Sequence, residues 1–131
     1  MKSRFLLLSV LFFLGCLTVE AQSTTFDLTG IWKNEQMRYE YHFKSDSSVI
    51  FSQSGYSAFI NSYTIDTSKS PIWLDFTMKM GSREQVIPAL LEIVSEDEII
   101  IEQFPPFSNH PVEFTENEYT KIRFKREKAG E

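Results

Sequence analysis

Apolar and polar side chains alternate along most of residues 28–126, and this period of two predicts β-strands. In residues 37–44 every second side chain is apolar or aromatic, and in residues 72–80 the same alternation runs without a break. Successive side chains of a strand point to opposite faces, so such segments form half-buried antiparallel strands. No helical period is evident beyond residue 22. We expect eight strands, in residues 28–33, 37–44, 48–53, 58–66, 72–80, 85–94, 98–104 and 119–126.

Short polar segments such as residues 45–47 and 81–82 separate most of these strands and predict tight turns. Strands that follow one another through tight turns pair with their neighbours, and closing such a sheet removes its exposed edges. The pattern therefore predicts one all-β domain over residues 22–126, a small eight-stranded antiparallel up-and-down barrel. Residues 127–131 are polar and are expected to form a disordered tail.

The first 21 residues have the pattern of an export signal. Lys2 and Arg4 precede an apolar run over residues 5–14, and a more polar stretch ends in Val19-Glu20-Ala21. A membrane-spanning helix needs about 20 apolar residues, so this run is too short to be one. We expect cleavage after Ala21 and release of the remainder into the periplasm or the medium.

Cys16 leaves a second possibility open for this segment. Residues 13–16 resemble a bacterial lipobox, in which the cysteine becomes lipidated and anchors the protein to the envelope. Phe13 and Leu14 depart from that pattern, which usually has leucine and a small residue at these two positions. Cys16 is the only cysteine of the chain, so the domain needs no disulfide.

The charge of the chain narrows the choice of partners. The net charge is −5, and cleavage after Ala21 leaves a remainder that is also acidic. Nucleic acids and anionic membrane surfaces require basic patches, so neither is an expected partner. Contact with a membrane is expected only if Cys16 is lipidated.

Two motifs stand out, Gly30-Ile31-Trp32 in the first expected strand and residues 63–75, which read Tyr-x-Ile-Asp-x-x-Lys-x-Pro-x-x-x-Asp. The first resembles a first-strand lipocalin signature, and the second is similar to a pattern of a family of small bacterial lipocalin-like domains, most of them uncharacterised secreted proteins. His110 stands where that family often has arginine, before a Pro-x-x-Phe element at residues 111–114. The matching positions are Gly30, Trp32, Asp66, Lys69, Pro71, Asp75 and Arg126.

This resemblance implies an antiparallel barrel that binds a small molecule inside it. In larger lipocalins the first-strand tryptophan packs at the closed end, under a late arginine. By that analogy Trp32 meets Arg123 or Arg126 in a cation–π contact worth about 0.5–2 kcal/mol.

Polar and aromatic side chains on the apolar faces are the candidate ligand-binding residues. They are Tyr39, Tyr41, Asn61, Tyr63 and Phe76. One interpretation is a cavity lined by rings with a few polar groups, as is usual for small-molecule sites. The other is core packing, because an eight-stranded barrel is just wide enough to be filled by its own side chains. The corresponding functions are an envelope binding protein for a small apolar ligand and a non-enzymatic interaction module with a packed interior.

The residues offer little for catalysis or metal binding. No Gly-x-Ser-x-Gly motif or phosphate-binding loop is present, and His42 and His110 are expected to be solvated at the surface. We therefore expect no enzyme activity, no metal and no cofactor.

Residues 104–114 form a loop rich in proline and phenylalanine that has two interpretations. It could bind a protein partner or cover the barrel mouth as a lid. The alternative is a loop that folds back and plugs one end of the barrel.

Overall fold

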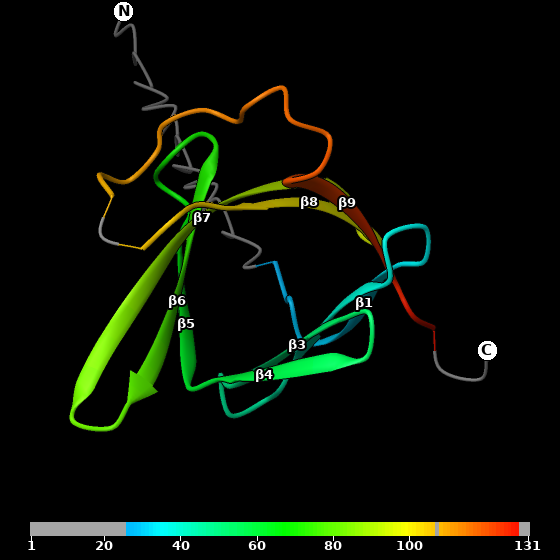
Figure 1. Ribbon diagram of the computed structural model, residues 1–131. Helices are drawn as coiled ribbons and strands as arrows, with labels where there is room; N and C mark the ends of the chain where they lie inside the picture. The colour runs from blue at the N-terminus through cyan, green and yellow to red at the C-terminus, as the bar shows by residue number, and fades with distance from the viewer. Residues whose placement is uncertain (1–25, 107, 129–131) are drawn as a thin grey trace, which may run out of the picture.

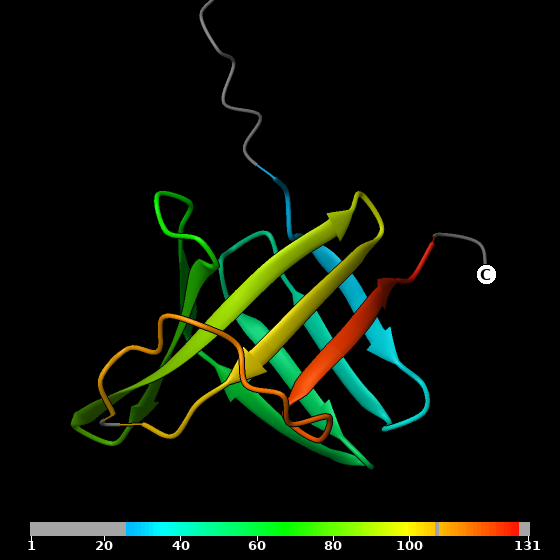
Figure 2. The same cartoon turned by 90° about the horizontal axis from the view of Figure 1, so that it is seen from above.

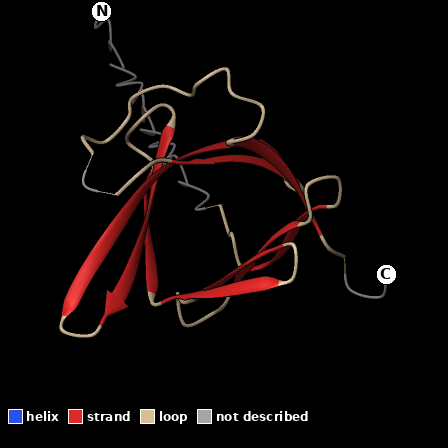
Figure 3. Cartoon of the chain, viewed as in Figure 1, coloured by secondary structure: helices blue, strands red, loops and turns tan. Residues whose placement is uncertain are grey.

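The computed structural model describes residues 26–106 and 108–128, and Figures 1 and 3 show that these form an antiparallel all-β structure without helices. The strands are β1 (Gly30–Asn34), β2 (Tyr39–Phe43), β3 (Val49–Gln53), β4 (Tyr56–Ile60), β5 (Ser62–Asp66), β6 (Ile72–Met80), β7 (Arg83–Ser95), β8 (Glu98–Gln103) and β9 (Lys121–Arg126). In the described residues no helix is long and apolar enough to cross a membrane.

The strands form a single sheet that curls into a nearly closed barrel. Their order is β4-β3-β2-β1-β9-β8-β7-β6-β5, so the first strand pairs with the last. The two edge strands, β4 and β5, follow each other in the chain. The prediction of an all-β, antiparallel up-and-down barrel is confirmed.

The barrel has nine strands instead of the expected eight because the predicted strand 58–66 is divided at Asn61. The Asn61 amide donates to Thr77 O at 3.0 Å, and its side-chain oxygen accepts from Lys79 N at 2.7 Å. Here the chain leaves β3, its partner up to Ile60, and joins β6. The inward face changes phase at this corner: Ile60 is buried and Phe59 is 55% exposed in β4, whereas Tyr63 and Ile65 of β5 pack against the core.

Aromatic rings fill the middle of the barrel. Phe43, Phe76 and Phe124 are fully buried, and the Tyr41 ring stacks on Phe76 with 5.7 Å between centroids. Phe43 in turn meets the edge of Tyr63 at 5.1 Å. Ring pairs at such distances stabilise a core beyond the burial of their area. The interior is therefore packed through much of its length.

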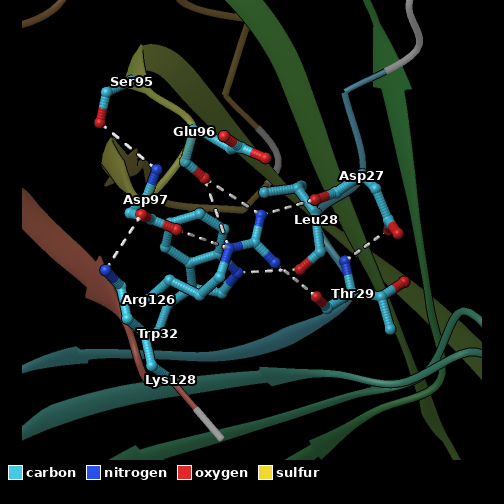
Figure 4. Close-up of polar contacts among 9 residues, drawn as sticks. All are labelled: Asp27, Leu28, Thr29, Trp32, Ser95, Glu96, Asp97, Arg126 and Lys128. Atoms are coloured by element: carbon cyan, nitrogen blue, oxygen red, sulfur yellow. Dashed lines mark hydrogen bonds and ion pairs between the residues drawn. The ribbon is translucent and has the colours of Figure 1, made fainter.

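Trp32 and Arg126 lie against each other at one end of the barrel, and Figure 4 shows the polar contacts around them. The guanidinium carbon of Arg126 lies 4.2 Å from the centroid of the buried Trp32 ring. Its nitrogens donate to Thr29 O at 2.8 Å, to Asp27 O at 3.0 Å and to Glu96 O at 3.3 Å. Of the two arginines expected to meet Trp32, the structure identifies Arg126.

Gly30 has a backbone conformation suited to this contact. Its φ is +130°, and a Cβ atom placed there would lie 3.4 Å from a guanidinium nitrogen of Arg126. An L-residue rarely adopts that φ, so glycine lets the first strand start close beneath the arginine.

The segment of residues 108–120, which we call the strap, crosses the outer face of β6 to β9 (orange in Figure 2). Trp73, Leu90, Glu102 and Lys121 form a row of outward-facing neighbours on these four strands. The strap contacts three of them: His110 stacks on Trp73, Thr115 donates to Glu102, and Lys121 lies over the Phe114 ring. Leu90 in this row points away from the core cluster and yet is 0% exposed. The interpretation in which the loop plugs a barrel end is therefore wrong for residues 110–115, because their contacts are with outward-facing side chains.

His110 anchors the strap, which corrects the expectation of a solvated histidine. Its ring stacks on Trp73 with 3.7 Å between centroids, and Nε2 lies 2.7 Å from the Asp75 carboxylate. Lys69 lies on Trp73 as well, 4.9 Å from the ring centroid. Lys69 and Asp75, two positions that match the family motif, thus contact Trp73 on the outer face and His110 on the strap, respectively.

Asp66 and Pro71, two positions that match the family motif, lie in the connection between β5 and β6. Asp66 accepts the Ser68 amide at 3.0 Å in the turn that leads to Pro71, where the Ser70–Pro71 peptide is cis. At the end of the chain, Glu127, expected in the tail, donates its amide to Ile31 O at 2.7 Å and pairs with Lys33 at 2.9 Å.

The signal segment, Cys16 and residues 129–131 lie outside the described residues.

Candidate functional site

A pocket of about 170 Å³ lies inside the barrel at the end away from Arg126. Its lining is uncharged and combines aromatic and aliphatic side chains with polar ones, and it consists of Tyr39, Tyr41, Phe51, Gln53, Ile101, Gln103, Tyr119, Thr120 and Ile122. It takes up the part of the interior that the stacked core rings leave open.

Strand register brings the lining residues together. Tyr39 and Tyr41 lie two apart on β2 and therefore share the inner face. Across the ladder, Tyr39 pairs with Gln53 and Tyr41 with Phe51 on β3. On the opposite wall Ile101 of β8 pairs with Ile122 of β9, and both belong to the core cluster. The walls are thus apolar, with a polar group at the end of each strand.

Two tyrosine–glutamine pairs supply the polar groups of the pocket. Gln103 Nε2 donates to the Tyr41 hydroxyl, and Gln53 Nε2 donates to the Tyr39 hydroxyl at 3.1 Å. Burial raises the pKa of Tyr41 above its ordinary value, so its hydroxyl stays neutral. In both pairs the tyrosine oxygen accepts, which leaves its proton available for a further acceptor.

The rim of the pocket is held from outside the barrel wall. Thr120 lines the pocket and donates its hydroxyl to Glu102 at 2.7 Å. Glu102 faces outward and is 1% exposed, and it also accepts the Thr115 hydroxyl and, at 2.8 Å, the Thr115 amide. Beside Thr120, Tyr119 stands 71% exposed at the mouth. One carboxylate therefore fixes both the strap and the rim.

Replacing Glu102 with glutamine should lower the free energy of unfolding by about 1–2 kcal/mol, because an amide cannot accept at both of its terminal atoms. The Thr115 amide hydrogen should also exchange faster with solvent. Chemical denaturation and hydrogen exchange measure the two effects. Glu98→Gln is the matched control on the same strand, since Glu98 pairs with the half-exposed Arg123. Equal losses for the two variants would contradict the role given to Glu102.

The structure separates the five candidate ligand residues. Tyr39 and Tyr41 line the pocket, and Phe76 lies behind the Tyr41 ring within the core. Asn61 and Tyr63 do not line it: Asn61 forms the β4–β5 corner, and Tyr63 contacts the far side of the core at Phe43.

Sequence reasoning missed both glutamines and the two strap residues of the pocket. A signal for the glutamines exists, because Gln53 follows Phe51 and Gln103 follows Ile101 by two positions on inward faces. A polar residue that continues an apolar face at a strand end marks a barrel mouth. No comparable pattern points to Tyr119 or Thr120.

The described residues contain no cluster of three histidine, cysteine, aspartate or glutamate side chains that could hold a metal ion. The only ionisable side chains that line the pocket are tyrosines. This lining is suited to holding a neutral molecule through contacts and hydrogen bonds. Comparison with family models, with curated proteins and with solved structures finds no match to this chain.

Proposed function

We propose that this chain is a binding protein for a small, largely apolar molecule, held in the pocket at the barrel mouth. The observation that supports this most is the lining itself, in which apolar walls surround two hydroxyls that can still donate. Apolar pockets with a few placed polar groups are the usual form of small-molecule sites. We propose no catalytic step, and the pocket needs no cofactor for binding.

The volume of the pocket limits the size of the ligand. Sites for drug-sized molecules measure about 300–1,000 Å³, whereas apolar cavities of about 150 Å³ bind benzene. At about 170 Å³ this pocket suits one ring with a short substituent. Large polycyclic ligands would have to extend beyond Tyr119 into solvent.

We also propose that the protein acts outside the cytoplasm. The support is the order of charged, apolar and small residues over residues 1–21. Intact-mass measurement of the protein from a bacterial host tests this directly. A chain that begins at Gln22 indicates a free protein, a diacylated or triacylated chain that begins at Cys16 indicates an anchored one, and a chain that retains Met1 contradicts export.

Filling the pocket should abolish binding. In Gln53→Trp the indole is placed at the mouth, and the chemical-shift changes that acetophenone and ethylbenzene cause in pocket amides should disappear. Ser52→Trp is the matched control, because Ser52 is the previous residue of β3 and points outward. If neither compound perturbs the pocket of the unmodified protein, the proposed function fails.

One observation favours a second candidate, a structural or interaction module without a ligand. Rings of Tyr41, Phe43 and Phe76 already fill the barrel below the pocket. This candidate predicts that Gln53→Trp changes nothing except stability, and that protein purified without detergent carries no bound small molecule in native mass spectrometry.

A further inference from the structure

We infer that the ligand is a neutral molecule with a single ring and a hydrogen-bond acceptor attached to it, such as a carbonyl oxygen, and that Tyr41 donates to this acceptor. This inference rests on the proposed function and specifies which molecules the pocket selects.

The need for an acceptor follows from the Tyr41 hydroxyl. Tyr41 is 2% exposed, and its oxygen already accepts a hydrogen bond from Gln103. Among the described residues the structure gives its proton no acceptor, and a hydroxyl that accepts one hydrogen bond can still donate another. Because Tyr41 lines the pocket, a ligand oxygen can occupy the open position.

The need for neutrality follows from the charges around the pocket. No charged side chain lines it. Glu102, an acid on the strand between the lining residues Ile101 and Gln103, points outward and is already bonded to Thr115 and Thr120. An ion buried without a partner pays a large desolvation cost. Anions and cations of the right size should therefore bind worse than a neutral molecule.

The walls define the rest of the ligand. Phe51, Ile101 and Ile122 present flat or aliphatic surfaces to the space beside the Tyr41 hydroxyl. With about 170 Å³ available, one six-membered ring can lie against them. Its acceptor then points to Tyr41 and Gln103.

Four probes that share a benzene ring test the inference: acetophenone, ethylbenzene, benzoate and benzylammonium. Dissociation constants come from amide chemical-shift titrations of the full mature protein. Acetophenone should bind about three- to tenfold more tightly than ethylbenzene, the range expected for one hydrogen bond. Benzoate and benzylammonium should bind more weakly than either.

The variant Tyr41→Phe should remove the preference for acetophenone and leave the affinity for ethylbenzene within about twofold, since it deletes only the hydroxyl. Retained ethylbenzene binding also shows that the variant is folded. Tyr63→Phe is the matched control, because Tyr63 does not line the pocket and its hydroxyl should not affect either probe.

The outcomes separate the two proposals. Binding of both neutral probes with no preference, or a preference that survives in Tyr41→Phe, overturns the ligand class and leaves the proposed function intact. Tighter binding of benzoate or benzylammonium overturns neutrality in the same way. If none of the four probes binds, the proposed function fails together with the inference.

Discussion

Replacing Trp32 with alanine should lower the free energy of unfolding by about 3–5 kcal/mol, the largest loss that we expect from a single substitution in this chain. Trp32 is 0% exposed at the centre of β1. Its indole nitrogen donates to Leu28 O at 2.8 Å, so the ring also ties the segment before β1 to the barrel. A stability of about 5–15 kcal/mol is usual for a domain, so the variant should be marginally folded at best.

The second tryptophan provides the matched control. Trp73 is half-buried on the outer face, between His110 and Lys69. Trp73→Ala leaves a gap that the strap and solvent can fill, and should cost about 1–2 kcal/mol. Urea denaturation followed by circular dichroism measures both variants. If Trp73→Ala costs as much as Trp32→Ala, the inner ring does not have the central role assigned to it.

The strands of this barrel could be predicted because most of them have one buried and one solvated face. In β2 and β6 the alternation of side chains is uninterrupted, and both strands lie where the pattern placed them. The corner at Asn61 could not be predicted, since Phe59 and Ile60 are both apolar and the pattern does not show which of them faces inward; the structure buries Ile60 and leaves Phe59 55% exposed. Local alternation therefore does not reveal where the chain changes its partner strand.

The strap was misplaced for a related reason. Leu90 and Glu102 lie on outward positions that solvent normally reaches, and their burial depends on a segment that follows later in the chain. For the same reason, only some of the residues that line the pocket could be predicted from the sequence. Tyr39 and Tyr41 could be chosen from β2 alone, whereas Thr120 lies on the strap, where its hydroxyl donates to Glu102.

Arg126→Ala should lower the free energy of unfolding by about 2–3 kcal/mol, the second-largest loss that we expect, through hydrogen bonds from a charged group and a cation–π contact. The guanidinium bonds three carbonyls from two segments that are far apart in sequence, residues 27–29 and Glu96. Without it, these carbonyls and one face of Trp32 become exposed to water.

Two further variants test whether geometry or charge is responsible. Arg126→Lys keeps the charge but not the planar fork of donors, so it should recover less than half of the loss. Arg123→Ala should cost less than about 1 kcal/mol, because Arg123 lies on the same strand with a 55% exposed side chain and one surface ion pair. Thermal and urea denaturation at low and high salt measure all three. If the loss in Arg126→Ala disappears at high salt, simple charge attraction explains it; a loss that persists identifies the directional contacts as the clamp that closes this end of the barrel.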